Sequence, residues 1–269
     1  MSATVTLSLR DGGVGRIDLS GVLPETLAGK SASEIAAMPL RLDGQPVALG
    51  ELFAVTPGAG HGLVIEAEGA QLDCLGKAMS AGLLRVEGSA GHYAGQDLRG
   101  GEVVIAGDCG DFAANGMRGG LLRIAGHAGD WLGAALIGER AGMAGGVVTV
   151  AGDAGERLGD RMRRGLILVR GQAGEACGAR MLAGTLVVAG GCVGAPGFGL
   201  RRGSLILGRA PELLPATFND SGVVELSWLN LLRRHAESFL PGVVPASARS
   251  RRYQGDLACG GKGELLVPA

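Results

Sequence analysis

Hydrophobic residues recur in a fixed order through the middle of the chain. Seven short units share the pattern (G/A/R)-x-x-(M/L)-x-x-G-x-(L/V/I)-x-(V/I/L)-x-G, with Arg209 in place of the last glycine. The units are Gly76–Gly88, Gly95–Gly107, Ala114–Gly126, Arg140–Gly152, Gly159–Gly171, Gly178–Gly190 and Gly197–Arg209. The glycine before each apolar stretch stands at 82, 101, 120, 146, 165, 184 and 203, so the successive spacings are 19, 19, 26, 19, 19 and 19. A fixed period is typical of repeat proteins, whose units bury their apolar faces only by stacking on one another.

Within each unit, apolar positions alternate with variable ones. Positions nine and eleven are apolar in all seven units, whereas position ten ranges from arginine to isoleucine. This period of two predicts a short strand with one face turned inward. Position four is always methionine or leucine, which predicts a narrow interior filled by stacked long side chains. The members of this column are Met79, Leu98, Met117, Met143, Met162, Met181 and Leu200.

These patterns predict an all-β protein: a single-stranded, right-handed parallel β-helix (a solenoid) of about seven to eight 19-residue coils. Each strand should pair in parallel with the equivalent strand of the next unit, because one short strand and two glycine turns cannot bury an apolar face alone. A single unit is too short for the helix pair of a helical solenoid. The segment Gly62–Glu66 resembles a degenerate earlier coil.

Two further segments flank the repeats, so the chain is expected to divide into 1–55, 56–209 and 210–269. Residues 1–55 alternate weakly and predict a small strand-containing region, with one or two helical turns at Ser31–Met38. Val223–Phe239 has the spacing of an amphipathic helix. Because the open end of a β-helix exposes unpaired strand edges, this helix is expected either to cover that end or to dock on a partner.

The composition fits a narrow interior and excludes several classes of protein. Glycine contributes 51 of 269 residues and aromatic residues only 3%, which favours many tight turns around small aliphatic side chains. A formal net charge of −1 argues against nucleic acid as a partner. No apolar run is long enough to span a membrane, and no signal peptide is predicted. The five cysteines are odd in number and form no CxxC pair, so they predict reduced thiols in a cytoplasmic protein.

Residue types that carry catalysis are scattered along the chain. The glycine turns lead into strands rather than helices, which argues against a nucleotide-binding loop. The histidines at 61, 92, 127 and 235 lack metal-ligand spacing, so no metal site is predicted. Asp108, Asp130 and Asp153 are expected to serve turns, and Cys109 and Cys192 occupy a column of small inward residues. A carbohydrate-active β-helix enzyme, which would need paired acids on one strand face, stays open as an alternative.

Arginine recurs at position five, just before the strand. The arginine column consists of Arg99, Arg118, Arg163 and Arg201, it is interrupted by Ala144 and Leu182, and Arg164 and Arg202 follow at position six. Equal positions line up in stacked coils, so these residues predict a broken ladder along one edge. The ladder is either a solvated face, a set of inter-subunit salt bridges, or a track for an extended polyanion, which guanidinium groups suit.

The 26-residue spacing contains an insertion of seven residues between two coils. Insertions in solenoids bulge from one face and often mark the contact side. Trp131 precedes the insertion, and Leu136 and Ile137 within it would be wasted in solvent, so these three residues predict a partner contact. Apolar residues at position ten predict a large interface on the outer face of the strands. They are Val104, Leu168, Val187 and Ile206.

The repeat with methionine in its fourth column resembles the C subunit of formylmethanofuran dehydrogenase, as does the ending Tyr253-Gln-Gly-Asp with the later Gly260-Gly-Lys-Gly-Glu. The same β-helix is similar to the C-terminal domain of the glutamate synthase large subunit. The chain is rich in Ala, Arg and Gly, which looks bacterial. The resemblance therefore points to the homologous C subunit of the formyltransferase/hydrolase complexes of methylotrophic bacteria.

This resemblance implies a non-catalytic structural subunit in a four-subunit complex of one-carbon metabolism and formaldehyde oxidation. Its partners would be a formyltransferase, a metal-dependent hydrolase subunit and a further subunit. Formyl would pass from formyl-tetrahydromethanopterin to a methanofuran-type carrier, and the hydrolase would release formate. This chain would bind no cofactor itself and carry no catalytic residue, while the glutamyl tail of the carrier would give the arginine column an anionic ligand.

Two other functions remain open. The complex could be a tungsten- or molybdenum-dependent formylmethanofuran dehydrogenase, with this chain again as its C subunit. In a different class, the chain would be a stand-alone β-helix enzyme, a transferase or a lyase.

Overall fold

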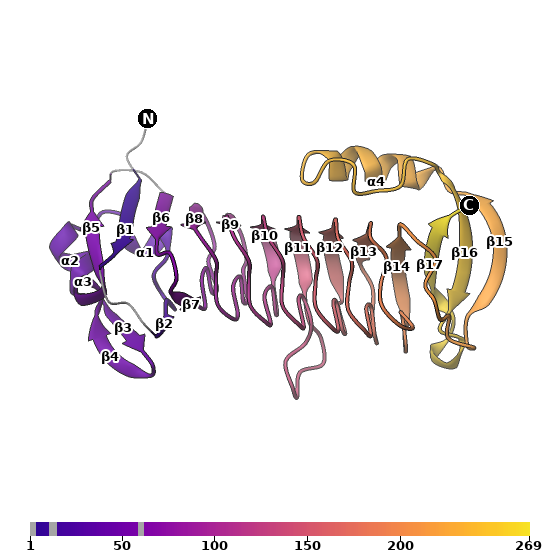
Figure 1. Ribbon diagram of the computed structural model, residues 1–269, viewed down its shortest axis with the longest axis horizontal. Helices are drawn as coiled ribbons and strands as arrows, with labels where there is room; N and C mark the ends of the chain where they lie inside the picture. The colour runs from indigo at the N-terminus through magenta and orange to yellow at the C-terminus, as the bar shows by residue number, and fades with distance from the viewer. Residues whose placement is uncertain (1–3, 11–14, 59–61) are drawn as a thin grey trace.

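Strands follow one another along the whole length of the molecule (Figure 1). The computed structural model describes residues 4–10, 15–58 and 62–269. Its main feature is a long, mostly parallel sheet of 13 strands in the order β15-β16-β17-β14-β13-β12-β11-β10-β9-β8-β6-β1-β5. These strands are β1 (Val5–Leu9), β5 (Phe53–Thr56), β6 (Gly62–Glu66), β8 (Leu83–Glu87), β9 (Glu102–Ile105), β10 (Arg118–Ile124), β11 (Ala144–Val150), β12 (Arg164–Val169), β13 (Thr185–Val188), β14 (Arg202–Leu207), β15 (Asn219–Glu225), β16 (Arg249–Gly255) and β17 (Lys262–Pro268).

The register of this sheet follows the sequence repeat. Leu166 of β12 pairs in parallel with Thr185 of β13, the equivalent residue of the next unit. Across the insertion, Leu121 still pairs with its equivalent, Val147, and the register holds to the end of β10, although it shifts by one residue between Arg118 and Leu121. Within residues 76–209, all of which the structure describes, the strands pair only in parallel. The predicted parallel pairing is confirmed, and β6 confirms the degenerate earlier coil because it pairs in parallel with β8.

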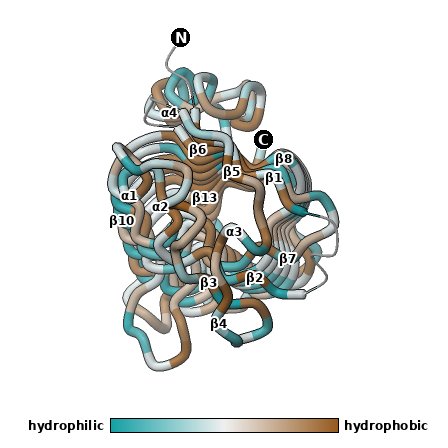
Figure 2. Tube along the Cα trace, turned by 90° about the vertical axis from the view of Figure 1, so that its left-hand side faces the viewer, coloured by the Kyte–Doolittle hydropathy of each residue, from teal (hydrophilic) through white to brown (hydrophobic). Residues whose placement is uncertain are grey.

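The interior consists of the columns that the repeat predicted. Positions nine and eleven are buried in every unit, and every residue of the methionine and leucine column at position four is 0% exposed. A second row of parallel bridges runs along a different segment of each repeat and contains Ala90, Cys109, Ala128, Ala154, Ala173 and Cys192. Viewed along the long axis, successive repeats lie one behind another (Figure 2). The arrangement is consistent with a β-helix-like solenoid.

Where the preceding repeat carries a methionine at position four, that methionine requires the glycine before the strand. Gly146 has φ +85°, and a Cβ there would lie 2.5 Å from Cε of Met117. At Gly203, with φ +97°, a Cβ would lie 2.7 Å from Cε of Met181. Both the backbone conformation and the space occupied by the methionine methyl group therefore exclude a side chain.

The N-terminal region joins the main sheet and adds a second, smaller one. β1 pairs in parallel with β6 and antiparallel with β5, which spans the expected boundary after residue 55. The smaller sheet has the order β4-β3-β2-β7. Its strands are β2 (Arg16–Asp18), β3 (Pro39–Leu42), β4 (Gln45–Ala48) and β7 (Gln71–Asp73), and the helices are α1 (Pro24–Leu27), α2 (Ala32–Ala36) and α3 (Leu49–Leu52). The predicted turns at Ser31–Met38 are confirmed by α2, which begins after Ser31 because its hydroxyl accepts the N–H of Glu34.

The C-terminal segment differs from its prediction in two ways. The helix α4 covers Trp228–Glu237, whereas Val223 and Val224 belong to β15 and pair with Arg251 and Ser250 of β16. The prediction of a helix from Val223 was wrong because cross-strand pairing of these β-branched residues overrides the helical spacing of the apolar positions. Beyond β14 the sheet continues not into this helix but through β17, β16 and β15, with β17 parallel to β14; the short 3-10 helix η1 (Leu257–Cys259) connects β16 to β17.

Instead of capping the end, α4 lies over the outer face of the sheet (Figure 1). Leu168 and Val187 are 0% exposed and Ile206 is 1% exposed, because they pack in one cluster with Leu229 and Ala236 of the helix. The prediction that these position-ten residues face a partner was therefore wrong: the chain covers them itself. Val104, the fourth position-ten residue that was expected in that interface, is half-buried.

Candidate functional site

The four residues of the arginine column occupy equivalent places on their coils. Each donates its backbone N–H to the carbonyl of the position-four residue of the preceding coil, at 2.9 Å for Arg99, 2.7 Å for Arg118, 2.8 Å for Arg163 and 2.9 Å for Arg201. Ala144 and Leu182 make the same bond, at 2.7 and 2.8 Å. All four arginines are exposed. The predicted column therefore exists, with its two interruptions.

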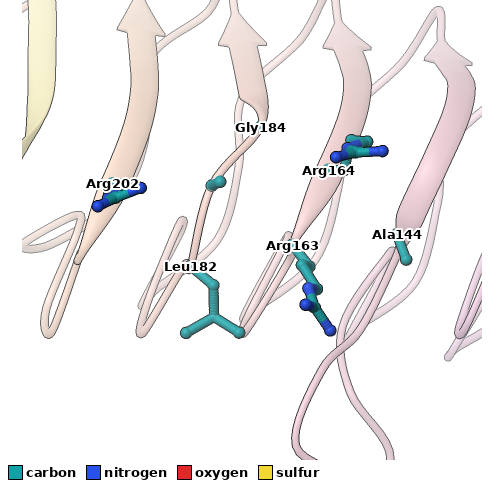
Figure 3. Close-up of a pocket in the computed structure, with 7 residues that line it drawn as sticks. Ala144, Arg163, Arg164, Leu182, Gly184 and Arg202 are labelled. Carbon is teal, nitrogen blue, oxygen red and sulfur yellow. The ribbon is translucent and has the colours of Figure 1, made fainter.

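The column is densest towards its C-terminal end, where a second row of cations joins it. Arg163, Arg164 and Arg202 line one pocket together with Leu182 and Gly184. In Figure 3, Arg164 and Arg202 extend from β12 and β14 on either side of Gly184, and Arg163 points the other way, beside Leu182. The neighbouring pocket is lined by Arg201, Arg202 and Lys262. We call these five cations the basic patch: Arg163, Arg164, Arg201, Arg202 and Lys262.

The positive charge of the basic patch has no acidic partner among residues 4–10, 15–58 and 62–269. Among the residues that the structure describes, no carboxylate forms a salt bridge with any of the five cations. Glu264 on the adjacent β17 is held instead by Arg252 at 3.0 Å and by the Ser204 hydroxyl at 2.6 Å. Guanidinium groups that are free of internal partners can bind carboxylates in pairs, so the patch is suited to an extended polyanion.

The insertion forms the second candidate surface and protrudes from the coils between β10 and β11 (Figure 1). Ile137 at its tip is 95% exposed, and Leu136 is half-buried. Trp131 is also half-buried and stacks on Phe112, with the ring centroids 5.8 Å apart and the planes at 18°. The guanidinium of Arg157 lies 4.8 Å from the centre of the Trp131 ring. The structure thus brings Trp131, Leu136 and Ile137 to one pocket.

Two features of this side were not foreseen from the sequence. Tyr93, Phe112 and Trp131 form a continuous stack, the first two rings 5.3 Å apart. Their equal places in successive units were the signal, and following this column through the repeat would have found the stack. The second feature is the buried Asp160, which binds Arg157 and Arg180. It had no comparable signal, because its partners belong to different columns of the repeat.

The polar residues of the turns are used to hold neighbouring coils together. Oδ1 of Asp108, Asp130 and Asp153 accepts the backbone N–H of the residue at the equivalent place of the next coil, at 2.7, 2.7 and 2.8 Å. Nδ1 of His92 and of His127 does the same for Asp111 and Asp153, at 2.9 and 3.0 Å. The interpretation of these aspartates as turn residues is confirmed. The two histidines lie in separate columns rather than together.

Metal binding and reactive thiols are the other chemistry considered for these turns. Within the described part of the chain, no group of three or more His, Cys, Asp and Glu residues could hold a metal ion; His61 lies outside the described residues. Burial raises the pKa of Cys109 to about 12 and that of Cys192 to about 11. These thiols stay protonated at neutral pH and fill the interior, as predicted. No helix in the described ranges is long and apolar enough to cross a membrane.

Comparisons with known proteins give one consistent relationship. No model of a known protein family matches the chain. It is 41% identical over 86 residues to the C subunit of the formyltransferase/hydrolase complex Fhc of Methylorubrum extorquens, a match that spans 32% of this chain and 32% of that relative. It is also similar, at 39% identity and a TM-score of 0.88, to a chain in the crystal structure of the formyltransferase/hydrolase complex FhcABCD from Methylorubrum extorquens in complex with methylofuran. This second match covers 98% of this chain and 99% of that one.

Proposed function

The chain belongs to the family of C subunits of formyltransferase/hydrolase complexes, and from this premise we propose that it is a non-catalytic structural subunit of such a complex. The observation that carries the proposal is the likeness over the full length of the chain to a component of FhcABCD. The two flanking regions are included in that match, so it does not rest on the repeats alone.

In the proposed complex, this chain assembles with a formyltransferase, a metal-dependent hydrolase subunit and a further subunit. The complex moves a formyl group from formyl-tetrahydromethanopterin to a methanofuran-type carrier and then releases formate, and the reacting groups belong to the other subunits. The methylofuran bound by the crystallised relative supports a carrier of this type. The expected location, the cytoplasm, stays a prediction.

A structural role is supported by how the turns use their polar residues. The carboxylates and imidazoles that could serve as acids or bases in a stand-alone enzyme, such as those of Asp108 and His127, accept backbone N–H groups between coils. Both comparisons are with formyltransferase/hydrolase complexes, so the tungsten or molybdenum dehydrogenase is not favoured. We also propose that the repeats close into a right-handed, single-stranded parallel β-helix, because each coil has a second parallel contact at the Ala90 to Cys192 row.

Co-expression tests the proposal directly. We expect a tagged copy of this chain to purify with the other three subunits encoded by its organism, and the purified assembly to release formate when given formyl-tetrahydromethanopterin and the carrier. The chain purified alone should release none. Formate release by the isolated chain would favour a stand-alone enzyme.

Within the complex, we propose that the arginine column guides the polyglutamyl tail of the carrier. Arg163 and Arg201, which belong to the basic patch, supply most of the attraction, and Arg99 and Arg118 extend the track. Adjacent coils are about 4.8 Å apart, so the interruptions at Ala144 and Leu182 leave gaps that long side chains only partly bridge. Exposed ion pairs contribute only about 0.2–1 kcal/mol each, so the column retains the tail loosely and allows it to move.

Two double variants of the complex test this role. The pair Arg163→Ala and Arg201→Ala should raise KM about fivefold for a carrier with a long tail, in line with roughly 0.5 kcal/mol for each exposed pair. It should leave KM unchanged for a carrier truncated to its furan head. Arg41→Ala with Arg249→Ala is the control, because it removes the same charge from exposed positions elsewhere on the chain. Equal losses on both carriers, or dissociation of the complex, would show that the arginines serve assembly.

A further inference from the structure

Asp160 organises the pocket beneath the insertion. Its side chain is 2% exposed and accepts two hydrogen bonds from the Arg180 guanidinium, one of them from Nε at 2.9 Å. Its second oxygen also lies 3.5 Å from Nη1 of Arg157. One buried carboxylate therefore fixes two arginines whose side chains remain more than a third exposed, at 39% for Arg157 and 38% for Arg180.

The wall of this pocket is held in place by stacked side chains. Trp131 ends the stack of three aromatic rings, and Arg157 lies over its free face. Both residues have positive φ angles, +63° for Trp131 and +55° for Arg157, so their side chains leave the backbone from the same strained turn of successive coils. A Trp–Arg pair held in this way is typical of the few residues that dominate protein–protein binding.

The insertion itself is tied to the coils at both ends. The N–H of Ala135 donates to the carbonyl of Asp160 at 3.1 Å, and the N–H of Gly142 donates to the carbonyl of Arg161 at 3.0 Å. Nη1 of Arg161 donates a hydrogen bond to the carbonyl of Glu139 at 2.7 Å. Ile137 is thus presented to solvent by an anchored loop, and a β-branched apolar residue in that position gains only if another surface covers it.

The charge of the pocket indicates what that surface carries. Arg157, Arg161 and Arg180 supply three positive charges against the single negative charge of Asp160. Arg161 forms no salt bridge with any described residue, and its bond to a carbonyl leaves its charge uncompensated. A cationic pocket beside an exposed isoleucine is complementary to an acidic side chain beside an apolar hollow.

We propose that the insertion is a two-part contact with another protein subunit: Ile137 enters an apolar hollow of that subunit, and a carboxylate of the same subunit enters the pocket between Trp131, Arg161 and Arg180. This inference rests on the proposed function, because it requires a multi-subunit complex. It is separate from the track for the carrier tail, since a polyglutamyl chain offers no apolar surface to Ile137. Asp160 is a positioning residue that acts through Arg157 and Arg180.

Binding of the purified chain to an assembly of the other three subunits tests the contact. Ile137→Asp and Arg161→Ala should each weaken binding by about 30-fold, the size expected for residues at the centre of an interface. Leu213→Asp is the matched control, because Leu213 is 63% exposed and lies outside the insertion, and it should bind like the wild type. Asp160→Asn keeps the shape but releases the arginines, and it should weaken binding although it raises the net positive charge of the pocket, a loss that charge attraction alone would not produce.

A photoreactive phenylalanine analogue at position 137 identifies the protein that contacts the insertion. We expect it to cross-link to one of the other subunits, at a site that contains an aspartate or glutamate. Cross-linking to a second copy of this chain, or wild-type affinity in both Ile137→Asp and Arg161→Ala, would overturn the inference while leaving the proposed function intact. If the wild-type chain fails to bind the other subunits, both are wrong. Thermal unfolding of each variant tests whether a loss of binding comes from a loss of folding.

Discussion

The outer face of β12–β14 and the side that carries the insertion differ in what covers them. Leu168, Val187 and Ile206 on the sheet are buried under α4, the helix of the same chain. On the insertion side, Ile137 is 95% exposed and Phe198 is 66% exposed, and both line pockets rich in arginine. The chain therefore completes one apolar surface by itself, and we propose that a partner of complementary charge covers the other. An apolar residue outside the repeat interior does not by itself show whether the chain or a partner covers it.

A charge placed under α4 should have the largest effect on stability. Leu168→Asp would bury an unpaired carboxylate between β12 and the helix, and we expect a loss of about 3–5 kcal/mol in the free energy of unfolding. The same change at Ile137 should leave the free energy of unfolding within about 0.5 kcal/mol of the wild type, because that residue is exposed. Urea unfolding of both variants measures the difference. Equal stability of the two would mean that α4 does not cover the sheet.

Two leucines of α4 sharpen the comparison within one helix. Leu229 is 1% exposed and faces the sheet, whereas Leu231 is 62% exposed. Leu229→Ala should cost about 2–4 kcal/mol through lost burial and the cavity left behind, and Leu231→Ala should cost little. Limited proteolysis of the Leu229 variant should show faster cleavage around α4 than in the repeats. Similar costs at both leucines would indicate that the helix rests on the sheet in another orientation.

At the turns, polar side chains bond neighbouring coils to one another. His127→Ala removes the acceptor of the Asp153 N–H and should cost about 0.5–1.5 kcal/mol. His127→Asn should recover most of the loss, because its side-chain oxygen can accept the same N–H, as the oxygen of Asp108 in the preceding coil accepts the N–H of His127. Urea unfolding would reveal both effects. A loss of the same size in the Asn variant would assign the role to the imidazole ring rather than to the hydrogen bond.

The smallest expected effect is a pH dependence at Asp256, which is 3% exposed and lines a pocket with Arg201. Burial alone would raise the pKa of Asp256, but hydrogen bonds from the Thr217 side chain and from the N–H groups of Gly199 and Ala258 outweigh it and lower the pKa. A depressed folded-state pKa contributes stability that is present above the unfolded value and is lost as the pH falls through the folded value. The protection of the Gly199 and Ala258 amides against exchange, corrected for the intrinsic effect of pH on exchange, should therefore fall only under acid conditions. In Asp256→Asn, the exchange should lose this dependence on pH.

The sequence alone predicted the structure of the repeats because their period is simple. A glycine, a methionine or leucine shortly before it and two alternating apolar residues recur in every unit, and they predicted the parallel register and the buried columns. The same columns also located the arginines and the insertion. The aromatic stack was within reach of this method, since Tyr93, Phe112 and Trp131 share one column.

What lies outside the repeat could not be predicted in the same way. The start of α4 was placed too early because Val223 and Val224 fit a helical pattern, and only their pairing with β16 shows that they form a strand. The cover of the sheet was misassigned because apolar side chains look alike whether the chain or a partner buries them. Asp160 and its arginines depend on contacts between different columns, which a one-dimensional repeat does not encode.

The most direct test of the central claim is the mass of the assembly that purifies with this chain. The chain, tagged and co-expressed with the other three subunits from its organism, should elute from size-exclusion chromatography in one peak that contains all four polypeptides. That peak should release formate from formyl-tetrahydromethanopterin in the presence of the carrier, and Ile137→Asp should move this chain out of it while Leu213→Asp should not. Elution of the wild-type chain alone, as a stable monomer, would contradict the account.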